Sequence, residues 1–282
     1  MKLLQWNIQW CRGMDGKVDP ARIARVAQSM CDPDIACFQE VAINFPALAG
    51  SSGEDQVAAL SAAFPGHSAH FVCAVDMPDG QGGRRRFGNL LLTRYPVQQV
   101  FRHSLPWPAH EDTPSMPRVA IEAVIDSPLG PLRVSTTHLE YYSGKQRNAQ
   151  IARLRDLHAE ACTHARTRAS AQYDSGPFQP FPRPLSAILT ADFNMKLDDP
   201  GYMALQSAYA DGTPRLVDAW AHMHPGEAHP PTFCLFDATY GKAPYCCDFI
   251  FVTEDLLPRI RAIRTDLETQ ASDHQPVIVE FH

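Results

Sequence analysis

Polar residues of the types that take part in catalysis stand at the ends of short apolar runs in this 282-residue sequence. The runs have the length and composition of buried strands. The polar residues are Asn7, Glu40, His138, Asp192, Asn194, Asp248, Asp273 and His274. Because a sheet holds its strand ends in fixed positions, such residues are well placed to form a site.

Each of these residues has an ordinary explanation when it is taken alone. A single Asn or Asp after a strand is most often a turn residue, and a single histidine there is more often structural than catalytic. Asp248 fits this explanation least well, because an acid in the apolar stretch from Cys246 to Val252 is costly to bury unless a cation partners it.

As a set, these side chains suit the attack of water on phosphorus. Glu40 and Asp273 carry oxygen ligands of the kind that Mg²⁺ or Mn²⁺ prefers. His138 and His274 can donate to a phosphate oxygen, and Asp192 can orient or deprotonate a water molecule. In such a reaction, positioning and charge neutralisation contribute most of the rate enhancement.

Six short motifs, taken in their order along the chain, resemble those of the endonuclease/exonuclease/phosphatase superfamily. They are Gln5-Trp6-Asn7-Ile8, Phe38-Gln39-Glu40-Val41, Thr137-His138-Leu139-Glu140, Asp192-Phe193-Asn194, Asp248-Phe249-Ile250-Phe251 and Ser272-Asp273-His274. That superfamily includes deoxyribonuclease I, abasic-site endonucleases, sphingomyelinases and inositol polyphosphate phosphatases. One such tripeptide occurs often by chance, whereas six in the right order do not.

The resemblance implies an α/β fold, a four-layer α-β-β-α sandwich of two packed mixed sheets flanked by helices. It implies a single domain over residues 1–282, with the site at one edge of the two sheets. It also implies a metal-dependent phosphoester hydrolase that uses Mg²⁺ or Mn²⁺.

The resemblance implies metal-binding residues as well. Glu40 matches the family's metal-binding glutamate, Asp273 matches the acid near the metal, and Asn7 matches the asparagine that supports metal and phosphate.

Catalytic roles follow from the same resemblance. Asp192 matches the aspartate that activates or orients the water, and Asn194 matches its phosphate-contacting neighbour. His274 matches the histidine that contacts the scissile phosphate, and Asp248 matches the carboxylate that orients that histidine. His138 matches the first histidine of the deoxyribonuclease-like branch, which contacts phosphate or helps the leaving group.

Two positions depart from the family pattern. Many abasic-site endonucleases have an acid where this chain has Gln9, so a second metal ligand there is in doubt. Ala191 replaces the usual glycine before the Asp-x-Asn motif, which we expect to be tolerated if its backbone angles suit alanine.

Further candidates lie near the predicted strands. Arg118 and Asn89 are candidate substrate-binding residues, although Arg118 could equally form a surface salt bridge. Arg84, Arg85 and Arg86 follow the loop Asp79-Gly80-Gln81-Gly82-Gly83, and we assign them to that loop. They are either a solvated turn or a clamp for a substrate phosphate.

Strands and helices that could position these residues alternate along most of the chain. Apolar runs predict strands at 2–8, 34–39, 89–93, 98–103, 118–125, 132–138, 185–190, 247–253, 260–265 and 276–281, with a hairpin at 118–138. Helical spacing predicts helices from Asp19-Pro20, at 56–64, at 145–169 and at 199–209. We assign the proline-rich segment 173–184 to a loop.

Composition limits the possible functions. The chain is 45% hydrophobic, has a net charge of -6 and contains no lysine-rich track, which argues against a protein that coats nucleic acid. With no apolar run of signal-peptide or membrane-helix length, we expect a cytoplasmic enzyme without a transmembrane segment. The eight cysteines are then expected to be reduced thiols rather than a disulfide framework or a zinc site.

The substrate stays open at this stage. A phosphodiesterase or nuclease-like activity is favoured, and a phosphomonoesterase or a phospholipid or sphingolipid phosphodiesterase is the alternative. Nucleic acid, a phospholipid and a small phosphate ester all remain possible substrates, and no obligate protein partner is inferred. A catalytically silent binding or scaffold module on the same fold is the alternative of a different class.

Overall fold

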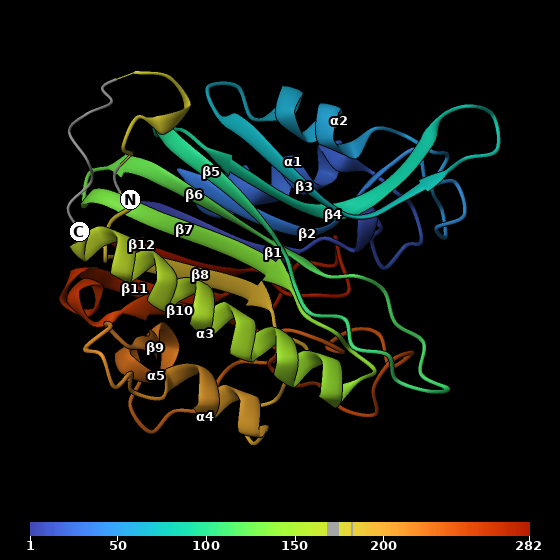
Figure 1. Cartoon of the computed structure of the whole chain (residues 1–282). Helices are drawn as coiled ribbons and strands as arrows, with labels where there is room; N and C mark the ends of the chain where they lie inside the picture. The colour runs from blue at the N-terminus through green and yellow to red at the C-terminus, as the bar shows by residue number, and fades with distance from the viewer. Residues whose placement is uncertain (168–174, 182) are drawn as a thin grey trace.

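Two six-stranded β-sheets pack face to face, and helices cover their outer faces (Figure 1). The structure, a computed structural model, describes residues 1–167, 175–181 and 183–282. Its strands are β1 (Lys2–Asn7), β2 (Ile35–Ile43), β3 (Ser68–Pro78), β4 (Arg84–Thr93), β5 (Val97–Ser104), β6 (Val119–Ser127), β7 (Gly130–His138), β8 (Ala187–Asp192), β9 (Leu216–Asp218), β10 (Asp248–Thr253), β11 (Ile260–Thr265) and β12 (Val277–Phe281). Its α-helices are α1 (Pro20–Met30), α2 (Gln56–Ala63), α3 (Gly144–Arg166), α4 (Pro200–Gln206) and α5 (Ala219–Met223), and short 3-10 helices span Gln9–Cys11, Gly176–Phe178 and Glu254–Arg259.

The two sheets have similar topologies. The first has the order β11-β12-β1-β2-β4-β3, and the second has the order β5-β6-β7-β8-β10-β9. One parallel pair lies inside each sheet, β1 with β2 and β7 with β8, while the other neighbours are antiparallel. The carboxyl ends of these four strands therefore point to one edge of the sandwich.

Three apolar clusters hold the layers together. The inner faces of the two sheets form the central core, which contains Leu3, Ile121 and Ile250. A second cluster packs α1 and α2 on the first sheet, and a third packs α3 and α4 on the second sheet (Figure 1). The predicted four-layer α/β sandwich is confirmed.

Local sequence signals explain several element boundaries. The Asp19 carboxylate accepts a hydrogen bond from the backbone N–H of Arg22 at 2.9 Å, and Pro20 begins α1 as expected. The predicted β6–β7 hairpin turns at Ser127, which pairs with Gly130. In the parts of the chain that are described, no helix is both long and apolar enough to cross a membrane.

Some elements differ from the sequence prediction. Strands β3 and β9 and helix α5 are not predicted by the apolar pattern. Helix α3 ends at Arg166, and residues 168 and 169 of the predicted helix lie outside the described residues. Residues 173, 174 and 182 of the predicted loop also lie outside them, and its described part includes the 3-10 turn Gly176–Phe178.

The arginine cluster is not part of the glycine-rich loop, so that assignment is wrong. Arg84 to Arg86 form the first residues of β4, where they pair with Asp76 to Pro78 of β3. The Nε atom of Arg84 donates to the Asp76 carboxylate at 2.6 Å, and the guanidinium of Arg85 donates to the backbone oxygen of Asp79. Cross-strand ion pairing on an exposed hairpin is what the structure shows for this cluster.

Candidate active site

A cavity of about 240 Å³ opens at the edge of the sandwich where the parallel strands end. Of the predicted site residues, those that line it are Glu40, Arg118, His138, Asp192, Asn194, Asp273 and His274. Asn7 and Asp248 contact members of this set from outside the lining. Residues from both sheets therefore meet at one place, although they are up to 267 positions apart in sequence.

Strand ends position most of these side chains. Asn7, His138 and Asp192 are the last residues of β1, β7 and β8, and Asp248, the first residue of β10, pairs with Asp192. Glu40 reaches the site differently, because it lies at a β-bulge between Phe38 and Val41 with a φ of 60°. A bulge turns a side chain away from the regular alternation of a strand.

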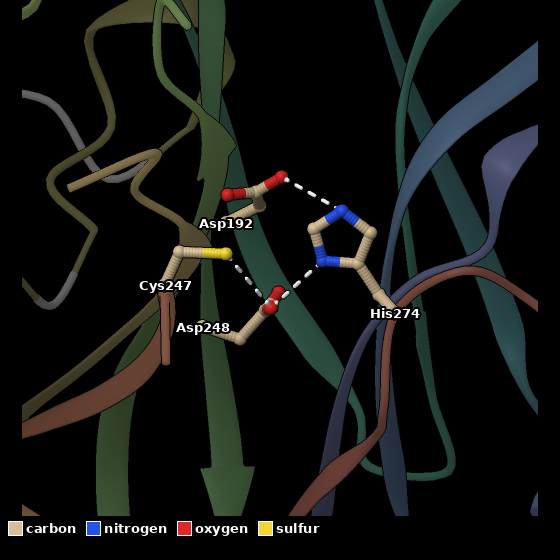
Figure 2. Close-up of side chains that lie close together, drawn as sticks. All are labelled: Asp192, Cys247, Asp248 and His274. Atoms are coloured by element: carbon tan, nitrogen blue, oxygen red, sulfur yellow. Dashed lines mark hydrogen bonds and ion pairs between the residues drawn. The ribbon is translucent and has the colours of Figure 1, made fainter. Parts of the chain in front are cut away.

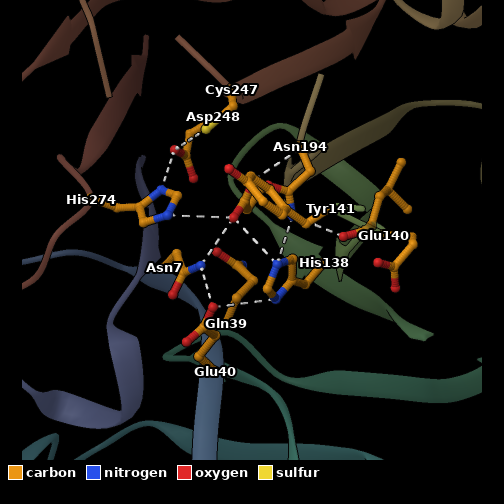
Figure 3. A network of polar contacts seen from close by, with 12 residues as sticks. Asn7, Gln39, Glu40, His138, Glu140, Tyr141, Asn194, Cys247, Asp248 and His274 are labelled. Atoms are coloured by element: carbon orange, nitrogen blue, oxygen red, sulfur yellow. Dashed lines mark hydrogen bonds and ion pairs between the residues drawn. The ribbon is translucent and has the colours of Figure 1, made fainter. Parts of the chain in front are cut away.

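The amide of Asn7 joins the two sheets. Its Nδ2 atom donates to Glu40 at 3.1 Å (Figure 3). The same atom donates to Asp192 Oδ2 at 3.0 Å. The other carboxylate oxygen of Asp192 accepts from the backbone N–H of Asn194 at 2.9 Å. Asp192 is thus buried but held in one orientation by donors on two sides.

His274 is oriented by a second buried acid. Its Nδ1 atom lies 2.9 Å from Asp248 Oδ2, and its Nε2 atom lies 3.6 Å from Asp192 Oδ2 (Figure 2). The ring of Phe233 stacks on the imidazole at 4.4 Å between centroids. Burial alone would lower the pKa of His274, but the carboxylates of Asp248 and Asp192 outweigh it and raise the pKa to about 10. The imidazole is therefore cationic at neutral pH.

His138 is in the opposite state. Burial, together with the nearby Arg118 guanidinium, lowers the pKa of His138 to about 3, so this ring is neutral. Its Nε2 atom lies 2.9 Å from the side-chain nitrogen of Asn194 and 3.3 Å from Asp192 Oδ2, and its Nδ1 atom lies 3.9 Å from the Glu40 carboxylate. The site therefore holds one cationic and one neutral histidine.

Two acids at the cavity lie in an environment that disfavours their charge. Burial raises the pKa of Glu40 to about 7, and the neighbouring Asp273 raises it further in the same direction. Burial also raises the pKa of Asp273. Gln9 donates from Nε2 to Asp273 at 2.6 Å. Such a pair of hard oxygen donors fits a divalent cation, which would relieve this charge.

Arg118 and Asn89 have different surroundings. Arg118 is buried at the cavity beside Glu140, with Nε 3.4 Å from that carboxylate, so it is not a surface salt bridge. Its Nη1 atom finds no hydrogen-bond partner among the described residues. Asn89 does not line the cavity, because its amide donates to the backbone oxygen of Val119 at 3.0 Å.

Ala191 is tolerated before the Asp-x-Asn motif. It is a fully buried residue of β8, paired with Phe249, and its φ is not positive. No glycine is therefore needed there.

Several supporting residues are missed by the sequence analysis. Thr232 accepts from the backbone N–H groups of Cys247 and Asp248 and so fixes the start of β10. Gln5 and Gln39 of the first sheet hydrogen-bond each other, and Gln39 also donates across to Thr136 of the second sheet at 2.8 Å. Glutamines inside apolar strands are the sequence signal that could have revealed this polar bridge, because buried amides require partners.

Comparisons with known proteins agree with this architecture. The sequence profile described as "Endonuclease/Exonuclease/phosphatase family" matches residues 4–274. No match is found among curated proteins.

Solved structures with a similar fold come from several organisms. An endonuclease/exonuclease/phosphatase from Beutenbergia cavernae is 22% identical, with a TM-score of 0.64 over 99% of this chain and 70% of that one. A mannosyl-6-phosphatase from Bacteroides thetaiotaomicron is 19% identical, with a TM-score of 0.66 over 100% of this chain and 99% of that one. D. rerio TDP2, complexed with a single-strand DNA product, is 17% identical, with a TM-score of 0.65 over 100% of this chain and 98% of that one. At these identities the likeness concerns the fold, whereas the profile covers nearly the whole sequence, and on that ground this chain belongs to the endonuclease/exonuclease/phosphatase family.

Proposed function

We propose that this protein is a divalent-metal-dependent hydrolase of phosphoester bonds, with phosphodiesters as its substrates. One observation carries the proposal: His274 and Asp192 lie 3.6 Å apart in the wall of a cavity that Glu40 and Asp273 also line. The attack of water on a phosphate requires a cationic hydrogen-bond donor, an oriented carboxylate and acidic side chains that can bind a metal ion.

Mg²⁺ or Mn²⁺ is the cofactor that the donor set fits best. Glu40 and Asp273 would hold it, with the Asn7 amide supporting Glu40 at 3.1 Å. When bound, such an ion supplies positive charge that polarises a phosphoryl oxygen and lowers the pKa of a bound water.

The other steps belong to the protein's own side chains. His274 donates from Nε2 to a non-bridging phosphate oxygen, while Asp248 at 2.9 Å keeps the ring in place. Asp192 accepts a proton from the attacking water, since the Asn7 amide and the Asn194 backbone N–H fix its orientation. The free Nη1 of Arg118 is a further donor for the phosphate.

His138 takes a positioning role in this scheme. Its neutral ring accepts from the Asn194 amide and thereby aims that side chain at the cavity. Its Nδ1 atom lies 3.9 Å from Glu40, so the neutral ring of His138 also borders the metal ligands.

Cavity size and chemistry favour a compact substrate. No lysine is among the described lining residues, and Arg118 is their one guanidinium. Aromatic side chains form much of the wall, namely Trp10, Phe87, Tyr141, Tyr142, Phe233 and Tyr240. A small phosphodiester with an aromatic or apolar substituent suits this wall better than a long polyanion, whose binding depends on many cationic contacts.

Paired chromogenic substrates test the proposal. We expect hydrolysis of bis-p-nitrophenyl phosphate with Mg²⁺ or Mn²⁺, much less hydrolysis of p-nitrophenyl phosphate, and none of either with chelator. A preference for the monoester would instead indicate a phosphomonoesterase. Failure to hydrolyse either compound or a wider panel including phospholipids, with no thermal shift on adding metal, would favour a silent binding module.

The cellular compartment is part of the proposal. All eight cysteines are free, and all except Cys73 are buried. Reduced thiols accord with a cytoplasmic enzyme, as proposed from the sequence.

A further inference from the structure

Four buried side chains around His274 bring unlike donor atoms together. They are Asp192, Cys247, Asp248 and His274, which Figure 2 shows facing a common centre. One donor atom from each lies within 4.8 Å of the others. This is the one His, Cys, Asp and Glu group with such spacing among the residues that the structure describes. We call these four residues the quartet.

We propose that the quartet is a binding site for a soft divalent cation, with Zn²⁺ as the type case, and that occupation of this site inhibits the enzyme. The types of donor atom distinguish the quartet from the acids around Glu40. Glu40 and Asp273 offer oxygen, which suits Mg²⁺ or Mn²⁺, whereas the quartet adds the thiol of Cys247 and the imidazole of His274. Sulfur and nitrogen donors select Zn²⁺ over Mg²⁺.

The donor atoms lie close to, but not at, the spacing of tetrahedral coordination. Bonds of about 2.0–2.3 Å to zinc place neighbouring donors roughly 3.3–3.8 Å apart. Cys247 Sγ lies 3.6 Å from Asp248 Oδ2, and His274 Nδ1 lies 2.9 Å from the same oxygen. Asp192 Oδ2 lies 3.6 Å from the other nitrogen of His274. A shared ion would take one nitrogen of His274, and the four donor atoms, which lie within 4.8 Å of one another, would have to draw together around it.

Surrounding hydrogen bonds already fix two of the ligands. The hydroxyl of Thr232 accepts from the backbone N–H of Cys247 at 3.0 Å and from that of Asp248 at 3.1 Å. Gln5 Nε2 lies 3.4 Å from Asp248 Oδ1, which leaves Oδ2 for the cation. Such outer contacts orient metal ligands and strengthen binding.

Inhibition follows from the chemistry of binding, and this part alone rests on the proposed function. The ion would replace the hydrogen bond between Asp248 and His274, and the thiol of Cys247 and the imidazolium would release their protons to water. His274 would keep the proton on Nε2 but lose its positive charge, and Asp192, bound to the ion, could no longer accept a proton from the attacking water.

Adjacent cysteines provide a matched control. Cys247 contacts Asp248 Oδ2 and packs with Phe233 and Cys234. Cys246 packs instead in the cluster under α3 and α4, so the two thiols lie on opposite sides of the chain. Cys247→Ser and Cys246→Ser make the same chemical change at neighbouring buried positions.

Cd²⁺ titration reports the thiolate directly. With Cd²⁺ as a spectroscopic substitute for Zn²⁺, we expect near-ultraviolet charge-transfer absorption that saturates near one equivalent in the native protein and in Cys246→Ser. In Cys247→Ser we expect this component to be lost. Equal absorption in both variants would overturn the proposal. Thermal melts identify a variant that fails to fold, and Cys247→Ala then takes its place.

Inhibition is measured separately. With Mg²⁺ saturating, we expect Zn²⁺ to inhibit hydrolysis reversibly. The concentration for half inhibition should rise at least about tenfold in Cys247→Ser relative to that variant's own uninhibited rate, because even outer-shell changes cost about 10–100-fold in metal affinity. Unchanged inhibition contradicts the proposal. A cadmium signal without any hydrolytic activity would refute the proposed function and leave the metal site standing.

Discussion

Glu40→Gln should stabilise the metal-free protein while abolishing its response to metal. The fold raises the pKa of Glu40 from 4.5 to about 7, first because the partly buried carboxylate is desolvated and then because Asp273 lies nearby. An acid with a raised pKa contributes most stability below its unfolded value, and this contribution is lost as the pH rises through the folded value. Glu40 therefore costs stability above about pH 7.

The size of the effect follows from the shift. The difference between a pKa of 4.5 in the unfolded chain and about 7 in the fold corresponds to about 3 kcal/mol of unfolding free energy at pH 8. At pH 5 the same linkage gives less than about 1 kcal/mol. Glutamine keeps the shape and can still accept from Asn7, but it carries no charge. A gain of about 3 kcal/mol corresponds to roughly 6–12 °C in Tm.

Thermal unfolding in chelator at pH 5 and pH 8 measures this difference. Added Mg²⁺ or Mn²⁺ should raise the Tm of the native protein and leave that of Glu40→Gln unchanged. Glu268→Gln is the control, because that acid is exposed and its replacement should change stability by less than about 0.5 kcal/mol. A Glu40→Gln variant that melts at or below the native temperature at pH 8 in chelator would show that the charge on Glu40 is not strained by the fold.

Three further predictions concern catalysis, substrate binding and stability. Asp192→Asn and His274→Ala should each lower kcat by at least about 10² with unchanged circular dichroism, since each removes a proton-transfer or charge-stabilising group. Arg118→Lys should raise KM in saturation kinetics, because an ammonium does not reproduce the guanidinium donors; an unchanged KM would exclude phosphate contact. Arg133→Met should lower the unfolding free energy in urea by about 1–3 kcal/mol, because the buried Glu122 loses its partner at 3.0 Å but keeps Arg183 at 3.4 Å, and an unchanged value would argue against the Arg133–Glu122 pair as a buried anchor.

Strand ends with strong local signals could be predicted from the sequence. The apolar runs before Asn7, His138 and Asp192 are uninterrupted and bounded by polar residues, so their ends are found to within one or two residues. Strand β3 gives a weaker signal, because it is an edge strand that pairs only with β4 and is half-exposed. Side-chain burial rather than intrinsic preference determines such strands.

Charge states could not be predicted, because they depend on neighbours from other strands. His138 and His274 look alike in the sequence, each at one end of an apolar run. The fold places the guanidinium of Arg118 near His138 and the carboxylates of Asp248 and Asp192 around His274. One ring is consequently neutral and the other cationic, a difference that arises only when the two sheets meet.

Alternation along the strands explains why so many distant residues converge. Side chains on one face of a strand recur every second residue, so Leu3, Gln5 and Asn7 of β1 share a face. Leu3 lies in the apolar core between the sheets, the Gln5 amide reaches across to Asp248 of the second sheet, and Asn7 reaches the cavity edge.

Two strands of the second sheet show the same change from apolar to polar residues as β1 of the first sheet. It runs through Val134, Thr136 and His138 in β7 and through Ile188, Thr190 and Asp192 in β8. Glu40 does not follow this alternation. Cys37 and Gln39 occupy the inward-facing positions of β2, so a regular strand would turn Glu40 outward, and only the bulge brings its carboxylate between the sheets. The inward-facing residues of these strands, every second one along the chain, therefore change from apolar to polar toward one strand end, and this change creates the site. The bulge at Glu40 is the one feature of the site that this two-residue pattern does not reveal.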